Sequence, residues 1–454
     1  MSNISIERCP TGIEELDEIL RGGFIRNSTV LIAGNPGTGK TIFAAKFIYE
    51  GVRKFKEPGV YLSFAESKKD FYMFMKNLGM DFEEIEKWNK FIFIEALTLA
   101  DESAVERAIE SLIDRVVEIK ARRAVIDSIT AITQVLNPAR ARALIHNTIV
   151  KGLKSYNVTT LLIADLPFGE NKVGFGAEEF VVDGVIIFRM DRVQELITRY
   201  MEIRKMRGIE IINVEIPFAI IPNKGIQIML MERPEVLISI SDERITTGIE
   251  KLDELFRGGL RKGAQLLITG PSGSGKSVLI ANIISNLITK NIRTMYVSFD
   301  EPPAHILSRI KLFREEINPS LIRIESINPT AYTCAEMTSR ILTNINDYKP
   351  DLIIMDGLTT LTRTHNLCRL WYYIVNMFLK FKKLGITGIY AYTANYPKEP
   401  VPLDTLADAV LIIQYKYHEG IRRIFMSKNR LDPTSTKQLL MRLGENGKLE
   451  LLEE

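Results

Sequence analysis

The chain of 454 residues is too long for one ordinary domain, so two or three domains are expected. Hydrophobic residues make up 46% of the chain and charged residues 25%, values typical of a globular protein, which excludes extensive disorder. The net charge of +3, from 59 basic and 56 acidic residues, does not indicate a dedicated nucleic-acid-binding protein, although a local basic patch could be present.

The three cysteines lack Cys-x-x-Cys spacing, which indicates reduced thiols rather than a disulfide framework or a zinc site. The four histidines lie far apart in the sequence and are more typical of surface or packing residues than of metal ligands. The N-terminus shows no signal-peptide pattern, and no apolar run reaches membrane-spanning length. We therefore expect a cytoplasmic protein that is not inserted in a membrane.

A glycine-rich stretch at residues 34–41 follows an apolar run at residues 29–33 and leads into a helical pattern. Strand, glycine-rich turn and helix together predict a phosphate-binding loop rather than a chance glycine turn. Its backbone N–H groups and the helix N-terminus would face an anion. Lys40 would reach the β and γ phosphates of a nucleotide, and the Thr41 hydroxyl would hold Mg²⁺. The predicted binding residues are Gly34, Asn35, Pro36, Gly37, Thr38, Gly39, Lys40 and Thr41.

The same motif occurs a second time, which makes the chain a tandem duplication. Its second copy consists of Gly270, Pro271, Ser272, Gly273, Ser274, Gly275, Lys276 and Ser277. The approach to the first loop, Thr-Gly-Ile-Glu-Glu-Leu-Asp at residues 11–17, also recurs as Thr-Gly-Ile-Glu-Lys-Leu-Asp at residues 247–253. Both pairs share an offset of 236 residues (247 − 11), so we predict two whole domains, 1–236 and 237–454.

Strand and helix patterns alternate in both halves. This alternation predicts an α/β fold in which a mainly parallel sheet is flanked by helices. Each domain is expected to end in a β-hairpin, at residues 218–229 and 439–452, with a linker near residues 232–244. The predicted helices span residues 68–78 and 104–119, and the predicted strands span residues 59–64, 91–94, 124–126, 160–164, 294–299, 352–355 and 388–392.

A nucleotide site also needs a carboxylate to hold Mg²⁺, usually through bound water. Asp127 ends the apolar run at residues 124–126, and Asp356 ends the run at residues 353–355. One acid after one apolar run is weak evidence, but its recurrence after both loops favours a metal role. We therefore predict Mg²⁺ sites formed by Thr41 with Asp127 and by Ser277 with Asp356.

Hydrolysis needs a carboxylate that orients or activates the attacking water. Glu66, Asp300 and Glu301 follow matching predicted strands in the two halves, at the sheet edge where parallel sheets bind their ligands. These three acids are the candidate catalytic residues. The alternative is that each acid only stabilises the start of a helix, through the helix dipole. The spacing of the residues does not distinguish this structural role from the catalytic one.

A Lys-x-Arg pair ends one late strand in each half. The first pair is Lys205 and Arg207, and the second is Lys428 and Arg430. Residues two apart on a strand share a face, so each pair of cations points the same way. A solvated surface is the usual reason for such a pair. The alternative is a finger that reaches the phosphates of a neighbouring subunit, where positive charge stabilises the transition state.

These features together resemble the KaiC family, which comprises two-domain RecA-like ATPases. The resemblance rests on the double domain, the approach to each loop, the two phosphate loops, the acids after the strands and the stretch Gly-Ala-Glu-Glu-Phe-Val-Val-Asp at residues 176–183. It implies tandem RecA-like P-loop domains that form a homohexameric double ring with ATP bound between subunits. It also implies that the four cations of the Lys-x-Arg pairs act in trans on the neighbour's nucleotide.

The chain departs from the family pattern at two places. The catalytic acid pair, usually two glutamates, falls on Ala65–Glu66 and on Asp300–Glu301. We therefore expect the first loop to serve mainly assembly and the second to carry most phosphoryl transfer. The Ser-Thr pair that the family's clock protein autophosphorylates falls on Asp404 and Thr405, which leaves Thr405 as the candidate acceptor and makes a two-step cycle and a circadian role unexpected.

The leading interpretation is a regulatory Mg²⁺-ATPase hexamer, with Ser/Thr autokinase activity as a further capacity and a regulatory protein as a partner. One alternative is a DNA-dependent recombinase or helicase on the same core, but no DNA-binding segment is visible, so nucleic acid is not indicated. A second alternative is a scaffold that ATP holds together with little turnover, which Ala65 supports for the first domain.

Overall fold

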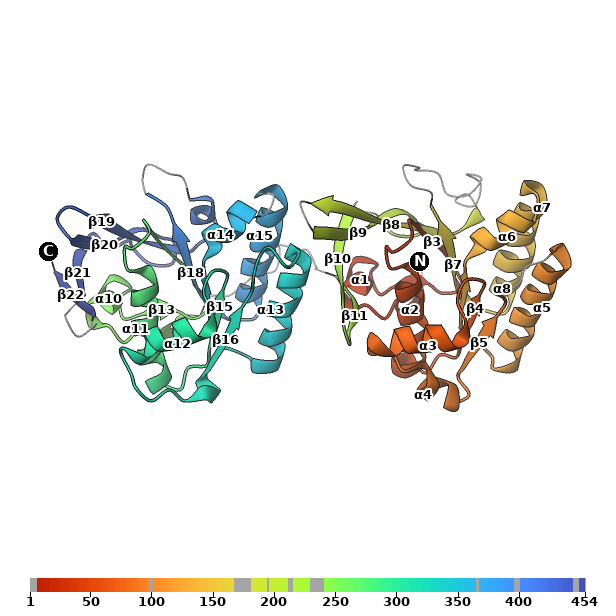
Figure 1. The fold of residues 1–454 in the computed structure, drawn as a ribbon, viewed down its shortest axis with the longest axis horizontal. Coiled ribbons are helices and arrows are strands. Elements are labelled where there is room, and N and C mark those ends of the chain that lie inside the picture. Colours follow the sequence, from red (N-terminus) through yellow and green to blue (C-terminus); the bar gives the residue numbers. More distant parts are fainter. Residues whose placement is uncertain are drawn as a thin grey trace, which may run out of the picture. The chain divides into compact units, whose positions relative to one another are not determined.

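The protein is described here by a computed structural model in which the chain forms two compact units, Met1–Leu230 and Met231–Glu454. The predicted boundary after residue 236 lies outside the described residues and stays a prediction, as does most of the predicted linker. Residues 176–180 of the family-like stretch also lie outside them. The described residues are 6–97, 101–166, 181–193, 196–210, 215–228, 241–364, 367–395, 401–443 and 449–453 (Figure 1).

The first unit contains a nine-stranded sheet in the order β11-β10-β9-β8-β3-β7-β6-β4-β5. The six strands from β8 to β5 pair in parallel, and the remaining three extend the sheet in antiparallel fashion. The strands are β3 (Thr29–Gly34), β4 (Gly59–Ser63), β5 (Phe91–Glu95), β6 (Arg123–Asp127), β7 (Thr159–Asp165), β8 (Gly184–Val193), β9 (Leu196–Met206), β10 (Glu215–Ile221) and β11 (Gly225–Ile228).

The second unit repeats this topology strand for strand, in the order β16-β15-β17-β18-β14-β19-β20-β21-β22. The mainly parallel sheet and the terminal hairpin predicted for each half are thereby confirmed. The strands are β14 (Gln265–Gly270), β15 (Thr294–Ser298), β16 (Ile322–Ser326), β17 (Leu352–Asp356), β18 (Thr387–Thr393), β19 (Ala409–Lys416), β20 (Ile421–Asn429), β21 (Gln438–Leu443) and β22 (Leu449–Glu453).

Helices flank both faces of the first sheet (Figure 1). Side-chain caps begin several of them, including Ser67 before α3 and Asp101 before α5, and both predicted helices are confirmed to within two residues. The helices are α1 (Glu14–Ile19), α2 (Lys40–Phe55), α3 (Lys68–Asn77), α4 (Phe82–Lys87), α5 (Glu102–Glu118), α6 (Ile129–Val135), α7 (Pro138–Ala143), the π-helix η1 (Leu144–Val150) and α8 (Lys151–Ser155).

The second unit has corresponding helices, and a capping box at Thr333 and Glu336 begins the long helix α13. Within the described part of the chain, no helix of either unit is long and apolar enough to cross a membrane. The helices are α10 (Glu250–Leu255), α11 (Lys276–Thr289), α12 (Pro303–Lys311), η2 (Pro319–Leu321), α13 (Cys334–Tyr348), α14 (Leu358–Thr364), α15 (Leu367–Lys383) and η3 (Pro402–Thr405).

A two-stranded ribbon precedes the phosphate loop in each unit. It is formed by β1 (Arg8–Cys9) with β2 (Phe24–Ile25) in the first unit and by β12 (Arg244–Ile245) with β13 (Leu260–Arg261) in the second. In both units the ribbon's second strand leads directly into the central strand that carries the loop.

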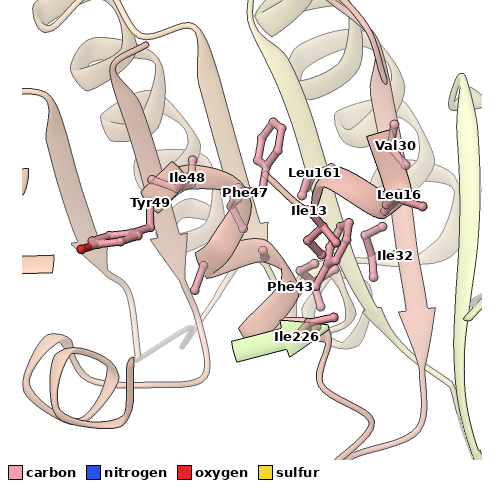
Figure 2. Close-up of a cluster of buried hydrophobic side chains, with 14 of the residues drawn as sticks. Ile13, Leu16, Val30, Ile32, Phe43, Phe47, Ile48, Tyr49, Leu161 and Ile226 are labelled. Carbon is pink, nitrogen blue, oxygen red and sulfur yellow. The ribbon is translucent and has the colours of Figure 1, made fainter. Parts of the chain in front are cut away.

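The central strand of the first sheet, β3, is buried along its whole length. Val30 and Ile32 pack in one hydrophobic cluster, while Leu31 and Ala33 pack in the cluster on the opposite face. This near-continuous apolar run is typical of a parallel strand covered by helices on both sides. Helix α2 covers one face with Phe43 among other apolar side chains (Figure 2). The core therefore fixes the loop between β3 and α2.

A fully buried arginine distinguishes the first unit from the second. Arg123 donates to Glu57 Oε2 at 2.7 Å and to the carbonyls of Pro10 and Phe47 at 2.8 Å each. Gly51 of α2 leaves room for it, because a Cβ there would lie 2.4 Å from the Arg123 side chain. At the positions equivalent to Gly51, Glu57 and Arg123, the second unit has the apolar residues Leu287, Ile292 and Leu352.

Replacing Arg123 with leucine, as in the second unit, should destabilise the first unit by about 3 kcal/mol, because Glu57 stays buried with Arg26 as its remaining cation. Hydrogen–deuterium exchange followed by mass spectrometry should show faster amide exchange in α2 and unchanged exchange in α11, which is the internal control. The double change Arg123→Leu with Glu57→Ile should lose less protection. Equal protection of α2 in the wild type and Arg123→Leu would contradict the prediction.

Candidate nucleotide sites

Both phosphate loops leave the carboxyl end of a buried central strand and enter a helix. Gly39 has a φ of 103° and Gly275 a φ of 97°, a left-handed conformation that glycine adopts without strain. Each glycine directly precedes the first residue of its helix, Lys40 of α2 or Lys276 of α11. The backbone N–H groups at these two helix starts form the kind of concave surface that binds an anion.

The lysine of each loop lies inside the loop. Lys40 Nζ donates to the carbonyls of Gly34 and Asn35 at 2.8 and 3.0 Å. It also lies 3.2 Å from a carboxylate oxygen of Asp165, at the end of β7. The ammonium is thus held at the position from which it would meet phosphate oxygens.

Lys276 has the same arrangement in the second unit. Its Nζ donates to the carbonyls of Gly270 and Pro271 at 2.9 Å each. Burial lowers the pKa of Lys276 to about 8, against the opposing effect of the nearby Asp356 and Asp300 carboxylates. A bound phosphate would supply the negative charge that favours the ammonium form.

The predicted metal residues of the first unit meet at the edge of the sheet. Thr41 Oγ1 donates to Asp127 Oδ2 at 2.8 Å, and the Tyr61 hydroxyl donates to the same oxygen at 2.7 Å. Burial raises the pKa of Asp127, and the two hydrogen bonds oppose that rise. Tyr61 is completely buried, so its bond fixes the orientation of the carboxylate.

The second unit repeats this geometry. Ser277 Oγ donates to Asp356 Oδ2 at 2.9 Å, and the Tyr296 hydroxyl donates to it at 2.6 Å. A hydroxyl beside a carboxylate fits Mg²⁺, which binds few protein groups and takes its other ligands from phosphates and water. The described residues contain no group of three His, Cys, Asp or Glu side chains that could hold a metal ion by themselves.

The candidate catalytic acid of the first unit has an unpaired oxygen. Glu66 Oε2 is buried and has no hydrogen-bond partner among the residues that the structure describes. Burial raises the pKa of Glu66, and the Asp127 and Asp70 carboxylates raise it further. The backbone N–H of Glu66 donates to Ser63 Oγ at 2.9 Å, which holds the residue at the end of β4.

In the second unit the two candidate acids have different environments. Glu301 forms a two-bond ion pair with Arg309 of α12, at 2.9 and 2.7 Å. Asp300 accepts from Ser298 Oγ at 3.3 Å, and no ion pair engages it within the described ranges. Burial raises the pKa of Asp300, with added effects of the Asp356 and Glu301 carboxylates. The structure therefore separates two acids that the sequence presents as a pair.

The first basic pair lies at the far end of the sheet from its own phosphate loop. Strand β9 ends at Met206, between Lys205 and Arg207, and the register places Met206 beside Gly184 and Gly184 beside Val30. The loop begins four residues further along β3, about 13 Å away along the strand.

Contacts hold this basic pair in place at the end of the sheet where the parallel strands begin, which we call the amino edge. Lys205 Nζ donates to the carbonyl of Val182 at 2.8 Å, and Arg207 forms an ion pair with Asp183 at 2.8 Å. Asp183 also accepts from the backbone N–H of Thr29 at 3.0 Å, at the start of the loop-bearing strand.

The second basic pair lies at the same place in its unit. The register sets Asn429, between Lys428 and Arg430, beside Ala409, and Ala409 beside Leu266. Leu266 again precedes the start of its loop by four residues, about 13 Å along the strand. The cations and the loop of one unit are thus on opposite edges of its sheet.

The candidate phosphate acceptor lies beside this second pair. Thr405 is exposed at the end of η3, four residues before β19. Lys428 Nζ donates to the carbonyl of the preceding residue, Asp404. Burial and then the neighbouring Arg430 lower the pKa of Lys428. The hydroxyl and the two cations therefore belong to one region of the amino edge.

Several residues of these sites were not identified from sequence. Tyr61 and Tyr296 lie inside predicted strands, but the shared pattern Tyr-x-Ser-Phe in the two copies was an available signal. Asp165 directly follows the predicted strand at residues 160–164. The second unit has Thr393 at the equivalent position, so comparison of the two repeats did not single out Asp165.

An aromatic and cationic cluster also borders the second loop. The Tyr417 hydroxyl donates to the carbonyl of Ser272 at 2.7 Å, and the Arg422 guanidinium lies 4.2 Å from the centroid of the Tyr415 ring. Flat aromatic and guanidinium groups beside a phosphate loop can stack on a planar base. The sequence signal for this cluster was the alternation of Tyr415 and Tyr417 at the end of β19.

Comparison with known proteins agrees with the duplicated architecture. The family model described as "ATPase: KaiC" matches the chain twice, over residues 9–233 and 245–453. The circadian clock oscillator protein KaiC of Thermostichus vulcanus is 30% identical over 433 residues, which cover 91% of this chain and 83% of the relative.

Two further relatives cover both units as well. The circadian clock protein KaiC2 of a Synechocystis species is 30% identical over 454 residues, covering 94% of this chain and 78% of the relative. The circadian clock oscillator protein KaiC of Prochlorococcus marinus is 28% identical over 430 residues, covering 91% and 86% of the two chains.

Replacing Tyr296 with phenylalanine should raise the Mg²⁺ concentration needed for half-maximal ATP turnover by about tenfold, because the Asp356 carboxylate loses the bond that orients it. A Mg²⁺ titration of turnover at saturating ATP measures this shift. Tyr390→Phe is the matched control, since Tyr390 is equally buried in the same sheet but donates to Gln265 instead. Equal Mg²⁺ requirements of the two variants would refute the orienting role.

Proposed function

This chain belongs to the KaiC family of ATPases, and we propose that it works as a Mg²⁺-dependent ATPase in a homohexameric double ring, with each ATP bound between neighbouring subunits. The observation that carries the proposal is the separation of each phosphate loop from its basic pair by about 13 Å of buried strand. Because the cations cannot approach their own loop without unravelling the sheet, they are positioned to serve the loop of another subunit.

The loop side of each site would bind and orient the nucleotide. The buried ammonium of Lys40 or Lys276 and the backbone N–H groups at the helix start would contact the β and γ phosphates. Bound Mg²⁺, held by Thr41 with Asp127 or by Ser277 with Asp356, would supply charge neutralisation. The tyrosine behind each carboxylate keeps it turned towards the hydroxyl.

The acids at the ends of β4 and β15 would orient the attacking water. Asp300 suits this role in the second unit because its pKa is raised, first by desolvation and then by the Asp356 and Glu301 carboxylates, whereas Glu301 is held by Arg309. Glu66 would take the role in the first unit, since one of its oxygens lacks a partner among the described residues. Ala65 supports a slower reaction there, so the first loop would act chiefly in assembly.

The amino edge would complete each site from the neighbouring subunit. Lys205 with Arg207, and Lys428 with Arg430, would stabilise the charge that develops on the γ phosphate during transfer. Thr405 shares that edge, so its hydroxyl would receive the γ phosphate from the neighbour's ATP rather than from its own loop. In that step the Thr405 oxygen forms a bond to the γ phosphorus, the bond from that phosphorus to the β phosphate oxygen breaks, the hydroxyl proton passes to water, and ADP leaves.

Location and partners are part of the proposal. A cytoplasmic location is supported by Cys9 and Cys334, which are buried as thiols, the form that a reducing compartment preserves. A regulatory protein partner rests on the family resemblance. A scaffold that ATP holds together is the second candidate function, and Ala65 favours it for the first unit only.

Following the γ phosphate of labelled ATP in Lys40→Ala and Lys276→Ala separates the two loops. Lys276→Ala should remove most of the released label while the ring persists, because the second loop carries most turnover. Lys40→Ala should weaken assembly itself. Label retained on the protein reports the autokinase activity, and Thr405→Ala should abolish that retained label without preventing phosphate release.

Loss of released label only in Lys40→Ala would contradict this division between the loops. A wild-type protein that binds no ATP, or that turns it over only when DNA is added and with strong salt dependence, would contradict the proposed function.

Asp300→Asn should lower phosphate release by about a hundredfold, because the asparagine amide cannot polarise the attacking water as a carboxylate does. The measurement is best made in a Glu66→Gln background, which silences the first unit. Glu301→Gln is the matched control and should lower the rate far less, since Glu301 is occupied by Arg309. A larger loss from Glu301→Gln than from Asp300→Asn would assign the role to Glu301 instead.

A further inference from the structure

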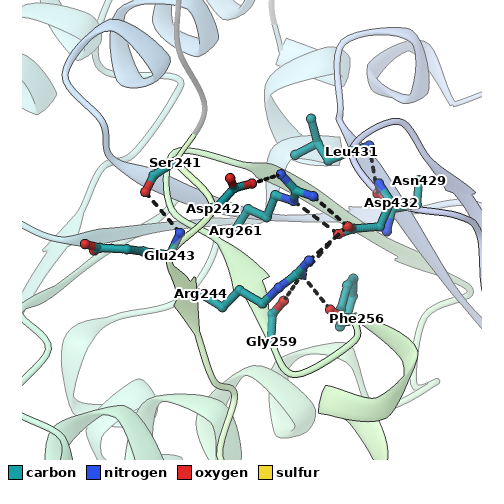
Figure 3. A network of polar contacts seen from close by, with 10 residues as sticks. All are labelled: Ser241, Asp242, Glu243, Arg244, Phe256, Gly259, Arg261, Asn429, Leu431 and Asp432. Atoms are coloured by element: carbon teal, nitrogen blue, oxygen red, sulfur yellow. Dashed lines mark hydrogen bonds and ion pairs between the residues drawn. The ribbon is translucent and has the colours of Figure 1, made fainter.

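One carboxylate of the second unit, Asp432, binds two arginines at once (Figure 3). Arg244 donates to its two oxygens at 3.0 and 2.9 Å, and Arg261 donates to them at 3.4 and 2.8 Å. The Asp432 side chain is only 9% exposed. The two guanidinium groups lower the pKa of Asp432 to about 2, so it stays ionised throughout the neutral range. Two forked, charge-assisted contacts define its position closely.

The two arginines belong to the ribbon that precedes the second phosphate loop. Arg244 of β12 and Arg261 of β13 are direct partners in the register. Arg244 also donates to the carbonyls of Phe256 and Gly259 at 2.8 and 3.0 Å, which ties the ribbon's turn to the same group. The ribbon continues into β14 within a few residues, so the arginines are anchored to the central sheet.

Asp432 itself ends the turn that follows β20 and carries Arg430, whereas Lys428 lies within β20 and is paired with Val410 of β19. Asn429 Oδ1 accepts from the backbone N–H groups of Leu431 and Asp432 at 3.1 and 3.2 Å, which folds the chain tightly after β20. The backbone N–H of Arg430 donates to the carbonyl of Asp408 at 2.8 Å. Arg430 is therefore fixed on one side by the sheet and on the other by Asp432. We call residues 430–432 the basic turn.

The first unit lacks this ion-pair anchor at the same place. Its residues equivalent to Arg244, Arg261 and Asp432 are Arg8, Ile25 and Ile209. Arg8 donates to the carbonyl of Gly208 at 3.4 Å and to the carbonyl of Gly23, in its own ribbon, at 3.5 Å. A Cβ on Gly208 would lie 3.0 Å from Ile25 Cδ1. Apolar contact and a single long hydrogen bond from the ribbon to the turn, Arg8 to Gly208, thus replace the four bonds to Asp432.

The side chains of Arg207 and Arg430, the arginines of the two basic pairs, are also held differently. Arg207 forms an ion pair with Asp183 at 2.8 Å. Asp408, the equivalent acid, is paired with Lys382 at 2.7 Å, and no ion pair of the Arg430 side chain occurs within the described part of the chain. The placement of Arg430 therefore depends on its backbone, and so on the turn that Asp432 ties down.

We propose that Asp432 is a positioning residue for Arg430: clamped between Arg244 and Arg261, it holds the basic turn in the conformation that presents Arg430, next to Lys428 of β20, to the neighbouring subunit's nucleotide. This inference rests on the proposed function, because it requires the basic pair to act in trans. It assigns the clamp to the second unit alone and leaves the ATP-binding residues of the same subunit unchanged.

The test uses the full-length protein with Glu66→Gln in every chain, so that phosphate release reports the second unit. Asp432→Asn should keep the assembly but lower release by about tenfold to a hundredfold, the cost of a small misplacement of a reacting group. Asp432→Glu should recover part of the rate. Asp242→Asn is the matched control: it removes another carboxylate from Arg261, but Asp242 is 95% exposed and touches no part of the basic turn, so release should stay within about twofold.

Mixed rings show whether the effect acts in trans. Asp432→Asn subunits keep a competent loop, and Lys276→Ala subunits keep a competent basic turn. After subunit exchange at equal concentrations, release should recover to about a quarter of the wild-type rate, because random mixing joins the two competent halves at about one interface in four. A merely destabilised Asp432→Asn subunit would not restore activity to its neighbour.

Three outcomes overturn the inference, and they identify which step fails. If Arg430→Ala lowers release but Asp432→Asn does not, the clamp is unnecessary and only this inference fails. If Asp432→Asn lowers release but mixed rings show no recovery, Asp432 acts on its own subunit and the inference also fails. If Arg430→Ala leaves release unchanged, the trans role in the proposed function fails, and the inference fails with it.

Discussion

Each unit is built around one buried strand that separates its phosphate loop from its basic pair. Strands β3 and β14 are buried along their whole length. Because a protein interior is closely packed, the two ends of such a strand cannot bend towards each other. In the proposed function, one chain therefore carries two halves of a triphosphate site that face different edges. A cyclic assembly that sets the amino edge of one copy against the carboxyl edge of the next would complete every site alike. Loop, metal residues, acids and cations all take their proposed roles from this separation.

The sequence predicts the parts of this arrangement that are local or repeated. Strand, loop and helix around Lys40 are contiguous, and recurrence at Lys276 confirms that they form a unit. Asp127 and Asp356 follow apolar runs, so parallel-strand geometry brings them to the loop edge. By contrast, the ion pair of Glu301 depends on Arg309, one helix later, and sequence spacing does not show whether such a side chain turns back towards the acid. The separate environments of Asp300 and Glu301 therefore emerge only from the fold.

Long-range polar contacts account for the other differences between prediction and structure. Arg123 starts a strand that otherwise reads as apolar, and its burial depends on Gly51 and Glu57 from distant elements. Asp432 meets Arg244 across 188 residues of chain. Both contacts occur in one unit only, so comparison of the two halves could not reveal them. After duplication, the two copies kept their strand order and the loop-edge chemistry, while the contacts that brace each sheet diverged.

The central claim, that no single chain completes a site, is tested most directly by specific ATP turnover along a protein dilution series, with native mass spectrometry of each sample. We expect the turnover per subunit to fall in parallel with the ring population, because separated subunits retain the loops but lose the neighbour's cations. A monomer that turns over ATP at the same rate per subunit as the undiluted assembly would contradict the claim.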